Sequence, residues 1–512
     1  MGSSSTAAEM EGPGLLLALM RELRGLPDKQ KDFLICQLSA LCAAFLFRRY
    51  LHPMYTSPAI RHAVATLLGL YICMFCFGWY TALLVGDVLL CYGILLAVDR
   101  KHVHIYSLAA AMCCLVAVQV MYYMGDDKES SEITGAIMII TQKITRVAFE
   151  LHDGTAKMAE SLNPGQKLRA IRRLPGPLEY LSYHFNFLGI VAGPLCSFND
   201  YVAFIGGRCY WNKEKSTSGS LEPSPTSAVM DKLGRCCLLL GLHLTLSKAF
   251  PITYNLDESF LATAHLPQRL GYVYLSMLAC RPKYYFLWTM ADAINNAAGF
   301  GFSGYNKDGK PCWDLLTNLN IFRIETSTSL KMLIDNWNIH TSAWLKEICY
   351  ERCPVHPMLA TFLLSALWHG VFPGYYLAFL SALIMSLAGQ AVRRNFRHHF
   401  LHSVARKRFY DVLTWMATQV SISYTLTPFI LLSLEPSLRF YRSWWYIFHI
   451  LALLLILLLP QKRVSFPHES SKAGSLPLGN NGPLHQNGAT ATGNNIDPPE
   501  KMLHRQHKPV CL

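Results

Sequence analysis

Charged residues are scarce in this sequence, because lysine, arginine, aspartate and glutamate make up only 15% of its 512 residues. A soluble domain of average composition carries about 25% charged residues. Hydrophobic residues reach 52%, and the mean hydropathy is +0.23. This shortage of charge excludes a protein whose whole surface faces water. We therefore expect an integral membrane protein.

Other common patterns are also missing. No cleavable signal peptide is evident, because the apolar stretch Leu15–Met20 is short and Arg21 follows it at once. The 16 cysteines lie mostly within apolar runs, which favours small buried side chains over a disulfide framework. Neither the Cys73–Cys76 pair nor the histidines at 398–402 predict a metal site. The glycines at 299–304 predict close packing or a tight turn rather than a dinucleotide-binding loop.

Long apolar runs are abundant instead. A membrane-spanning helix needs about 20 mostly apolar residues. The candidate segments are Phe33–Phe47, Ala63–Leu84, His104–Met124, Phe185–Phe204, Cys236–Phe250, Tyr272–Met290, Met358–Leu387, Phe409–Leu434 and Trp444–Pro460. Leu83–Val98 is shorter and fits a tilted or re-entrant element, and Pro373-Gly374 can split Met358–Leu387 in two. Because backbone groups in hydrocarbon must be satisfied locally, we predict an all-α, polytopic bundle of roughly nine to eleven membrane elements.

The composition changes along the chain and predicts three regions. Residues 1–30 fit a disordered or interfacial N-terminus, residues 31–460 a membrane-embedded domain, and residues 461–512 a disordered polar tail in the cytosol. Within the domain, residues 126–184 are less apolar, and we expect amphipathic helices on the membrane surface. Residues 291–357 are rich in Gly, Asn, Trp, Asp and Thr and predict an ordered stretch lining a cavity. The sequence leaves open whether Gly2 is myristoylated.

Basic residues outnumber acidic ones and give a formal net charge of +13. They cluster beside the apolar segments, and the positive-inside rule places those loops in the cytosol. Topology and anionic lipid headgroups are sufficient to account for the clusters. Attraction of a polyanionic cosubstrate is the alternative. Nucleic-acid binding is not expected, because the charges flank apolar segments and do not form one stripe.

His369 is the most informative single residue, because it is an ionisable group in the stretch Leu363–Gly370, which the sequence places well inside an apolar helix. Such groups are costly at membrane depth and usually face a cavity or the interior of the bundle. A neutral imidazole, with an ordinary pKa near 6.5, accepts a proton at working pH. His369 is therefore either a general base or a hydrogen-bonded structural residue.

Asn338 is the second candidate, within the polar segment Asp335–Thr341. A carboxamide donates and accepts hydrogen bonds, so it suits polarising a carbonyl or holding a substrate hydroxyl. Asparagine is also common where helices break, and Asp335 and His340 are nearby rivals. The absence of a Gly-x-Ser-x-Gly motif favours direct transfer over a covalent acyl-enzyme.

The sequence resembles the membrane-bound O-acyltransferase family at Trp337-Asn338 and Trp368-His369-Gly370. Further segments look like its lysophospholipid acyltransferase 1 and 2 branch; they are Thr141–Thr145, Leu178–Tyr183, Ala192–Cys196, Pro282–Phe286, Ala291–Phe302 and Leu364–Val371. The resemblance runs from about residue 33 to about residue 460 and leaves out both ends.

This resemblance implies a helical bundle around a central tunnel, in the endoplasmic reticulum membrane. Acyl-CoA then enters as the cosubstrate from the cytosol, without a cofactor or metal, and a lysophospholipid enters from the membrane. Lysophosphatidylethanolamine, lysophosphatidylserine and lysophosphatidylcholine are the expected acceptors. The paired Asn and His of the family correspond to Asn338 and His369. His369 would take the proton from the glycerol hydroxyl, while Asn338 would orient that hydroxyl or stabilise the oxyanion.

Two alternatives remain from the sequence. The first is an acyltransferase of the same family that acts on a sterol or a protein. The second is a membrane transporter, with His369 in a proton path and Asn338 at a broken helix. Headgroup, acyl preference and oligomeric state are left open.

Overall fold

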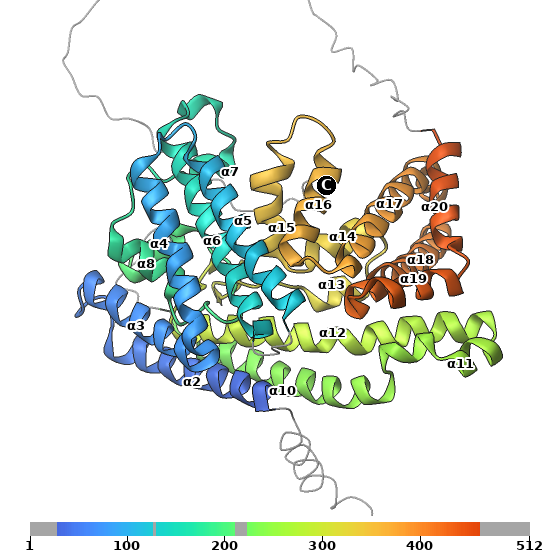
Figure 1. The fold of residues 1–512 in the computed structure, drawn as a ribbon, viewed down its shortest axis with the longest axis horizontal. Coiled ribbons are helices and arrows are strands. Elements are labelled where there is room, and N and C mark those ends of the chain that lie inside the picture. Colours follow the sequence, from blue (N-terminus) through green and yellow to red (C-terminus); the bar gives the residue numbers. More distant parts are fainter. Residues whose placement is uncertain (1–27, 126–129, 210–222, 461–512) are drawn as a thin grey trace, which may run out of the picture.

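The computed structural model describes residues 28–125, 130–209 and 223–460, which fold into an almost entirely helical bundle (Figure 1). The N-terminal helices are α2 (Asp28–Tyr50), α3 (Pro58–Phe77), α4 (Thr81–Ala97), α5 (Val103–Met124), α6 (Ser130–Thr155), α7 (Pro164–Arg169), α8 (Pro177–Phe185) and α9 (Phe198–Ile205). The central elements are α10 (Thr226–Ala249), α11 (Glu258–Thr263), α12 (Leu266–Ala297), β1 (Gly304–Tyr305) and β2 (Pro311–Cys312). The C-terminal helices are α13 (Ile321–Glu325), α14 (Leu330–Asn336), α15 (Ile339–Leu345), α16 (Pro357–His369), α17 (Pro373–Phe396), α18 (Val404–Leu431), α19 (Leu434–Ser443) and α20 (Ile447–Leu458).

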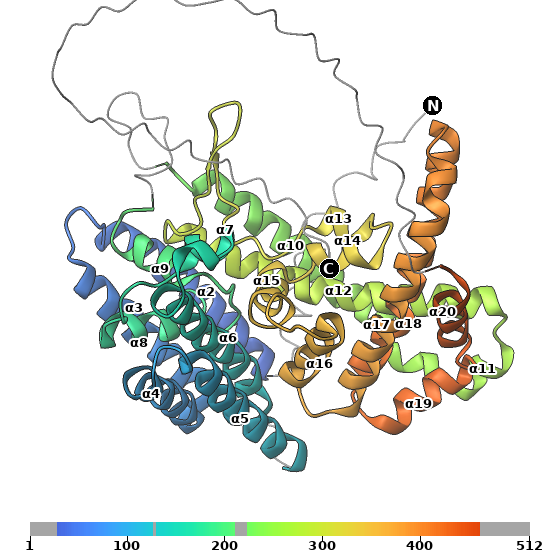
Figure 2. The same cartoon turned by 90° about the horizontal axis from the view of Figure 1, so that it is seen from above.

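The bundle has two hydrophobic clusters, which α12 joins. The N-terminal cluster gathers buried side chains of α2 to α6, α8 and α9, and Met290 and Ile294 of α12 belong to it. The C-terminal cluster gathers α13, α14 and α17 to α20, and Val273 and Tyr285 of α12 belong to that one. Figures 1 and 2 show α12 running past both groups, with α15 and α16 between them. The polar connection after α12 is therefore folded into the junction of the two clusters.

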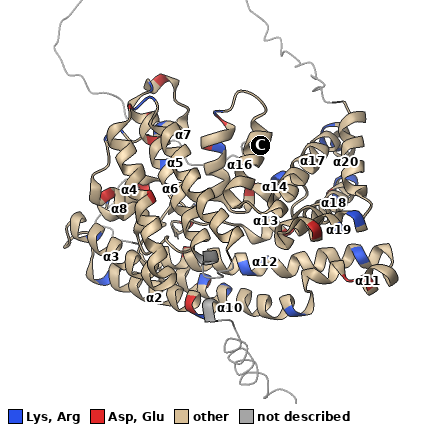
Figure 3. Ribbon diagram, viewed as in Figure 1, with Lys and Arg blue, Asp and Glu red and all other residues tan. Residues whose placement is uncertain are grey.

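Several helices are long and apolar enough to cross a membrane, which confirms the polytopic all-α prediction. Within the described ranges five segments meet this criterion, and the pair α19 and α20, bent by 73°, raises the number to as many as six. The five are Gln30–Tyr50, Pro58–Ala97, Val103–Met124, Thr226–Leu256 and Pro373–Phe400. The predicted nine to eleven elements include shorter or more polar helices such as α16 and α12, which this criterion does not count. Figure 3 shows how few charges the long helices carry: α5 has none, and α17 has them only in its last turn.

One predicted span is wrong. The sequence predicts that Phe185–Phe204 crosses the membrane, but α8 ends at Phe185, an irregular segment follows, and α9 begins at Phe198. Gly189, Gly193 and Pro194 interrupt the apolar run, since glycine and proline disfavour a continuous helix. Nearly every residue of this segment is buried. Its apolar character therefore comes from packing inside the bundle and not from contact with lipid.

The surface location predicted for residues 126–184 is also wrong for α6. Residues 140–153 of this helix are all buried. The polar side chains that suggest contact with water instead meet polar groups of other helices, as Arg146 does with Glu347. An amphipathic pattern alone does not distinguish these two kinds of polar environment. α6 is therefore a central element of the bundle.

Other predictions have mixed outcomes. Met358–Leu387 is split as expected, since α16 ends at His369 and α17 begins at Pro373. Leu83–Val98 forms most of α4, which follows α3 after the single turn Gly78–Tyr80. The disordered ends predicted for residues 1–30 and 461–512 lie outside the described residues, except that α2 already begins at Asp28. Residues 291–357 are ordered as predicted and contain the β-hairpin and α13 to α15.

Candidate active site

α15 and α16 form a helical hairpin that carries both predicted site residues. α15 continues through a π-helical segment, Lys346–Tyr350, and after a turn the chain returns as α16 (Figure 1). The 7 residues of α15 and the 5 of the π-helical segment span about 18 Å, and the 13 residues of α16 about 20 Å, at 1.5 Å per residue. Asn338 precedes the first arm and His369 ends the second. The matched arm lengths place both residues at the same end of the hairpin.

Asn338 is the N-cap of α15 and lies in the left-handed region, with φ 47° and ψ 55°. Asparagine tolerates this conformation better than most residues. Its side-chain carbonyl accepts a hydrogen bond from Asn318 Nδ2 at 3.0 Å. The preceding Trp337 packs its ring against those of Tyr284, Tyr285 and Trp288 of α12. Aromatic packing and Asn318 together hold the start of α15.

His369 is the last residue of α16 and not an interior residue, which corrects the predicted position. The apolar segment breaks at Gly370, whose φ of 154° ends the helix. The imidazole lies among aromatic rings, with centroid distances of 5.7 Å to Tyr375, 5.1 Å to Phe379 and 5.0 Å to Phe429. The ring is half-buried among these aromatic side chains.

α6 braces both arms of the hairpin from the N-terminal cluster. Gln142 Nε2 donates to Thr341 Oγ1 at 2.9 Å, and Trp344 Nε1 of α15 donates to Thr145 Oγ1 at 2.9 Å. On the other arm, Trp368 Nε1 donates to the Met138 carbonyl at 3.0 Å. The rings of Trp344 and Trp368 lie 5.8 Å apart, so they connect the two arms directly. Rigid support of this kind is what a precise site requires.

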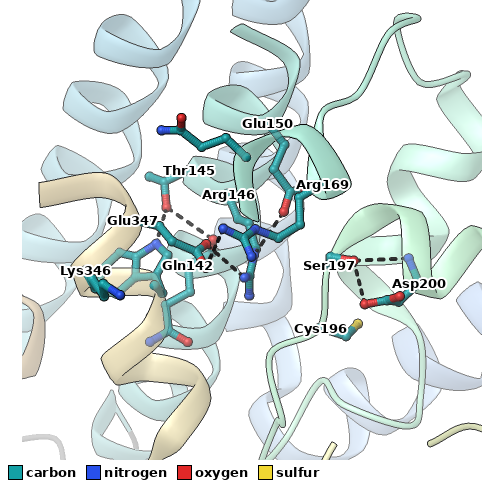
Figure 4. Close-up of polar contacts among 12 residues, drawn as sticks. Gln142, Thr145, Arg146, Glu150, Arg169, Cys196, Ser197, Asp200, Lys346 and Glu347 are labelled. Atoms are coloured by element: carbon teal, nitrogen blue, oxygen red, sulfur yellow. Dashed lines mark hydrogen bonds and ion pairs between the residues drawn. The ribbon is translucent and has the colours of Figure 1, made fainter. Parts of the chain in front are cut away.

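A charged network ties α6 to the π-helical segment (Figure 4). Arg146 lies 3.1 Å from Glu150 Oε1 and 2.9 Å from Glu347 Oε2, and Arg169 lies 2.9 Å from Glu347 Oε1. π-helical turns occur frequently at functional sites. Sequence reasoning missed this network. The signal is present as an Arg and a Glu four residues apart, a spacing that puts both on one face of a helix.

The two rivals of Asn338 have other roles in the structure. Asp335 pairs with Lys331 within α14, at 2.8 Å from Oδ2 to Nζ. His340 uses its backbone N–H to donate to Asn318 Oδ1 at 3.0 Å.

After α12, Gly299 and Gly301 both have positive φ, and a Cβ at Gly301 would lie 2.4 Å from Asn296 Nδ2. This agrees with the predicted tight turn.

An open polar cavity of about 480 Å³ lies beyond the other end of the hairpin. His104, His152, Lys157 and Arg352 contribute to its lining, together with Ser161, Asn163, Gln166 and Glu351. Glu351 and Arg352 belong to the turn between the π-helical segment and α16, so this cavity is separated from Asn338 and His369 by the length of the hairpin. Among the described residues no group of three or more His, Cys, Asp and Glu is arranged to hold a metal ion.

Fold and site together define a polytopic membrane protein that gathers an asparagine and a histidine at the junction of its two helical clusters. A profile of the membrane-bound O-acyltransferase family matches residues 29–427, and the chain belongs to this family.

Sequence similarity to known proteins extends over most of the chain. It is 48% identical to membrane-bound glycerophospholipid O-acyltransferase 2 of Gallus gallus, over 98% of this chain and 99% of that protein. It is 49% identical to membrane-bound glycerophospholipid O-acyltransferase 1 of Mus musculus, over 90% of this chain and 94% of that protein. It is 37% identical to lysophospholipid acyltransferase 6 of Drosophila melanogaster, over 86% of this chain and 63% of that protein.

Proposed function

We propose that this protein is a lysophospholipid acyltransferase that moves an acyl chain from acyl-CoA to the free hydroxyl of a lysophospholipid. Membership of the family supports the reaction class, and the names of the relatives support the lipid acceptor. The observation that carries the proposal is the hairpin, whose two arms bring Asn338 and His369 to one end. The expected acceptors are lysophosphatidylethanolamine, lysophosphatidylserine and lysophosphatidylcholine.

In this mechanism His369 is the general base. Its imidazole takes the proton of the glycerol hydroxyl, the oxygen forms a bond to the thioester carbonyl, and the carbon–sulfur bond then breaks. The proton passes from His369 to the departing coenzyme A sulfur. The position of His369 at the end of α16 helps, because a helix C-terminus stabilises a nearby cation by about 0.3–1 kcal/mol. General-base assistance contributes about 10²–10⁴ in rate.

Asn338 acts on the same reacting centre. One lost hydrogen-bond donor to an oxyanion typically costs about 10²–10³ in rate. The aromatic rings around His369 favour transfer over hydrolysis, because they keep water away from the thioester. The thioester is already activated, so the proposed chemistry uses neither a metal nor a bound cofactor.

Acyl-CoA is proposed to approach from the end of the hairpin that lies opposite Asn338 and His369. The polar cavity there is lined by Lys157 and Arg352, which pair with Asp153 in the structure and would be shared with a phosphate-bearing molecule. Figure 1 places α7, the turn before α16 and the C-terminal end of α20 on this same face. Asn395 Nδ2 lies 3.3 Å from the Pro460 carbonyl, so the basic end of α17 is next to the end of α20. This face is proposed to be cytosolic.

Product analysis with purified protein tests the proposed function. The protein would receive one acyl-CoA together with mixed lysophospholipids, a sterol and a peptide, and mass spectrometry would identify the acylated product. A diacyl phospholipid is the expected product. A sterol ester or an acylated peptide would establish the other acyltransferase activities, and solute flux without any ester product would indicate a transporter.

The proposed location is the endoplasmic reticulum membrane. The tagged protein should fractionate with endoplasmic reticulum markers, and enrichment in another membrane would contradict this location.

A further inference from the structure

Asn318 lies in the connection between β2 and α13 and is 5% exposed. It makes three hydrogen bonds with consecutive residues at the start of α15. Its Nδ2 donates to Asn338 Oδ1 at 3.0 Å, its backbone carbonyl accepts from Ile339 N at 2.8 Å, and its Oδ1 accepts from His340 N at 3.0 Å. No predicted site motif includes this residue. Its only sequence signal is its place in the polar stretch 291–357.

These contacts determine which way the Asn338 carboxamide faces. A backbone N–H can only donate, so the Asn318 atom that meets His340 N must be the carbonyl oxygen. The other end of the Asn318 carboxamide is then the amino group, which can only donate. The atom of Asn338 that receives this bond must therefore be its oxygen. The orientation of both side chains follows from one backbone group.

The bond from Asn318 uses one lone pair of the Asn338 oxygen and fixes the carboxamide, so that its amino group lies on the branch that does not face Asn318 Nδ2. An amino group can donate to a developing oxyanion but cannot accept a proton from a hydroxyl. Of the two roles considered for Asn338, a fixed amino group favours stabilisation of the oxyanion, because negative charge on the thioester oxygen strengthens the bond that this group donates. The left-handed backbone at Asn338 is held by the same neighbour, through Ile339 N and the Asn318 carbonyl.

We infer that Asn318 is a positioning residue, which fixes the Asn338 carboxamide so that its amino group donates to the thioester oxygen in the transition state. The inference rests on the proposed function and adds a residue and a direction to it. Asn318 itself touches neither the acyl group nor the hydroxyl in this account. Its effect on the reaction passes entirely through Asn338.

Two substitutions of Asn318 separate positioning from a purely structural role. Asn318→Asp still accepts from His340 N, but it can no longer donate to Asn338 Oδ1 and repels it, so the carboxamide turns over. Asn318→Ala loses both contacts and leaves the carboxamide free to adopt either orientation. Positioning therefore predicts a lower kcat for Asn318→Asp than for Asn318→Ala. The decrease in kcat for Asn318→Asp should approach the factor of about 10²–10³ that the loss of one oxyanion donor typically costs. The KM for acyl-CoA should stay within about twofold, since binding in the ground state is not the affected step.

A structural role predicts instead that the loss of kcat follows the loss of thermal stability in both variants, because the buried carboxylate of Asn318→Asp and the missing hydrogen bonds of Asn318→Ala would both act through folding. Asn320→Asp is the matched control, since Asn320 caps α13 through its bond from Arg323 N, and aspartate caps a helix equally well. Its kcat should stay near the wild-type value. A second measurement compares the Asn338→Ala variant with the double variant Asn318→Asp/Asn338→Ala. Their kcat values should be equal, because Asn318 acts only through the Asn338 carboxamide.

The inference is overturned if Asn318→Asp keeps near wild-type kcat, if Asn318→Ala is the more damaging change, or if the loss persists fully in the Asn338→Ala background. These outcomes can be distinguished from failure of the proposed function, because that failure would leave even the wild-type protein without any acylated lipid product. If Asn318→Asp does not fold, as judged by gel filtration in detergent, Asn318→Ala in the two backgrounds gives the same comparison.

Discussion

Gly370 follows His369 directly, and its substitution by alanine tests how strictly the turn after α16 is built. Its backbone, at φ 154° and ψ 177°, lies in a region that only glycine occupies readily. A Cβ would lie 2.8 Å from Tyr375 Cε2. Because the Tyr375 ring packs against His369, relief of this clash moves the surroundings of the proposed general base.

The expected cost of Gly370→Ala is about 1–3 kcal/mol of backbone strain. If the turn relaxes by displacing His369 and the same free energy is lost from the transition state, kcat falls by about 5-fold to 150-fold. Steady-state kinetics with purified protein measure this loss, and thermal denaturation in detergent reports any part of the strain that remains in the folded state.

Gly389→Ala is the matched control, because Gly389 lies within α17 with no heavy atom near the position of a Cβ. It should leave kcat within about twofold, since alanine is compatible with a helix interior. The reasoning is refuted if Gly370→Ala changes neither kcat nor the denaturation temperature, or if Gly389→Ala is equally harmful.

Three further predictions concern charge. Replacing Arg393, Arg394 and Arg397 together by glutamine should raise the KM for acyl-CoA at low salt and less at high salt, because salt screens long-range attraction; an unchanged KM at low salt would limit these residues to topology. The positive-inside rule puts the loop around residues 393–408 in the cytosol together with the chain end, so protease added to sealed microsomes should remove a tag at Leu512, and a protected tag would contradict this. Arg146→Met leaves Glu150 and Glu347 with less compensation in a buried position and should destabilise the protein by about 3–5 kcal/mol; an unaltered denaturation temperature would show that the network adds little.

The sequence predicts the fold class well because lipid imposes a simple rule. Helices such as α5 and α17 are long, apolar and free of interior charge, and few soluble helices share that pattern. Phe185–Phe204 fails because interior packing and lipid contact select the same side chains. Hydropathy alone does not distinguish a buried irregular segment from a membrane span. In Phe185–Phe204 the distinguishing signal is the glycine and proline residues, which disfavour a continuous helix.

Polar residues inside the bundle are harder to interpret from sequence. Arg146 and Glu150 resemble one face of a surface helix until the chain brings Glu347 and Arg169 to them. Asn318 is twenty positions before Asn338, and no local pattern links the two. Such pairings depend on tertiary contacts, so neither periodicity nor motif spacing reveals them.

Substitution of His369 and Asn338 tests the central claim most directly. His369→Ala should abolish acyl transfer while expression and acyl-CoA binding stay largely intact, because the base acts on the hydroxyl and its loss does not remove binding contacts. Asn338→Ala should also lower kcat, and the double variant should lose much less than the sum of both effects, since residues that act as a unit are non-additive.

Asp335→Asn and His340→Ala are the matched controls. Asp335 pairs with Lys331, and His340→Ala keeps the backbone N–H that donates to Asn318, so both should retain more activity. The measurement is the rate of diacyl phospholipid formation by each folded variant at saturating acyl-CoA. The account predicts no detectable product for His369→Ala, whereas near wild-type transfer by that variant, or an indispensable Asp335 or His340 beside a dispensable Asn338, would contradict it.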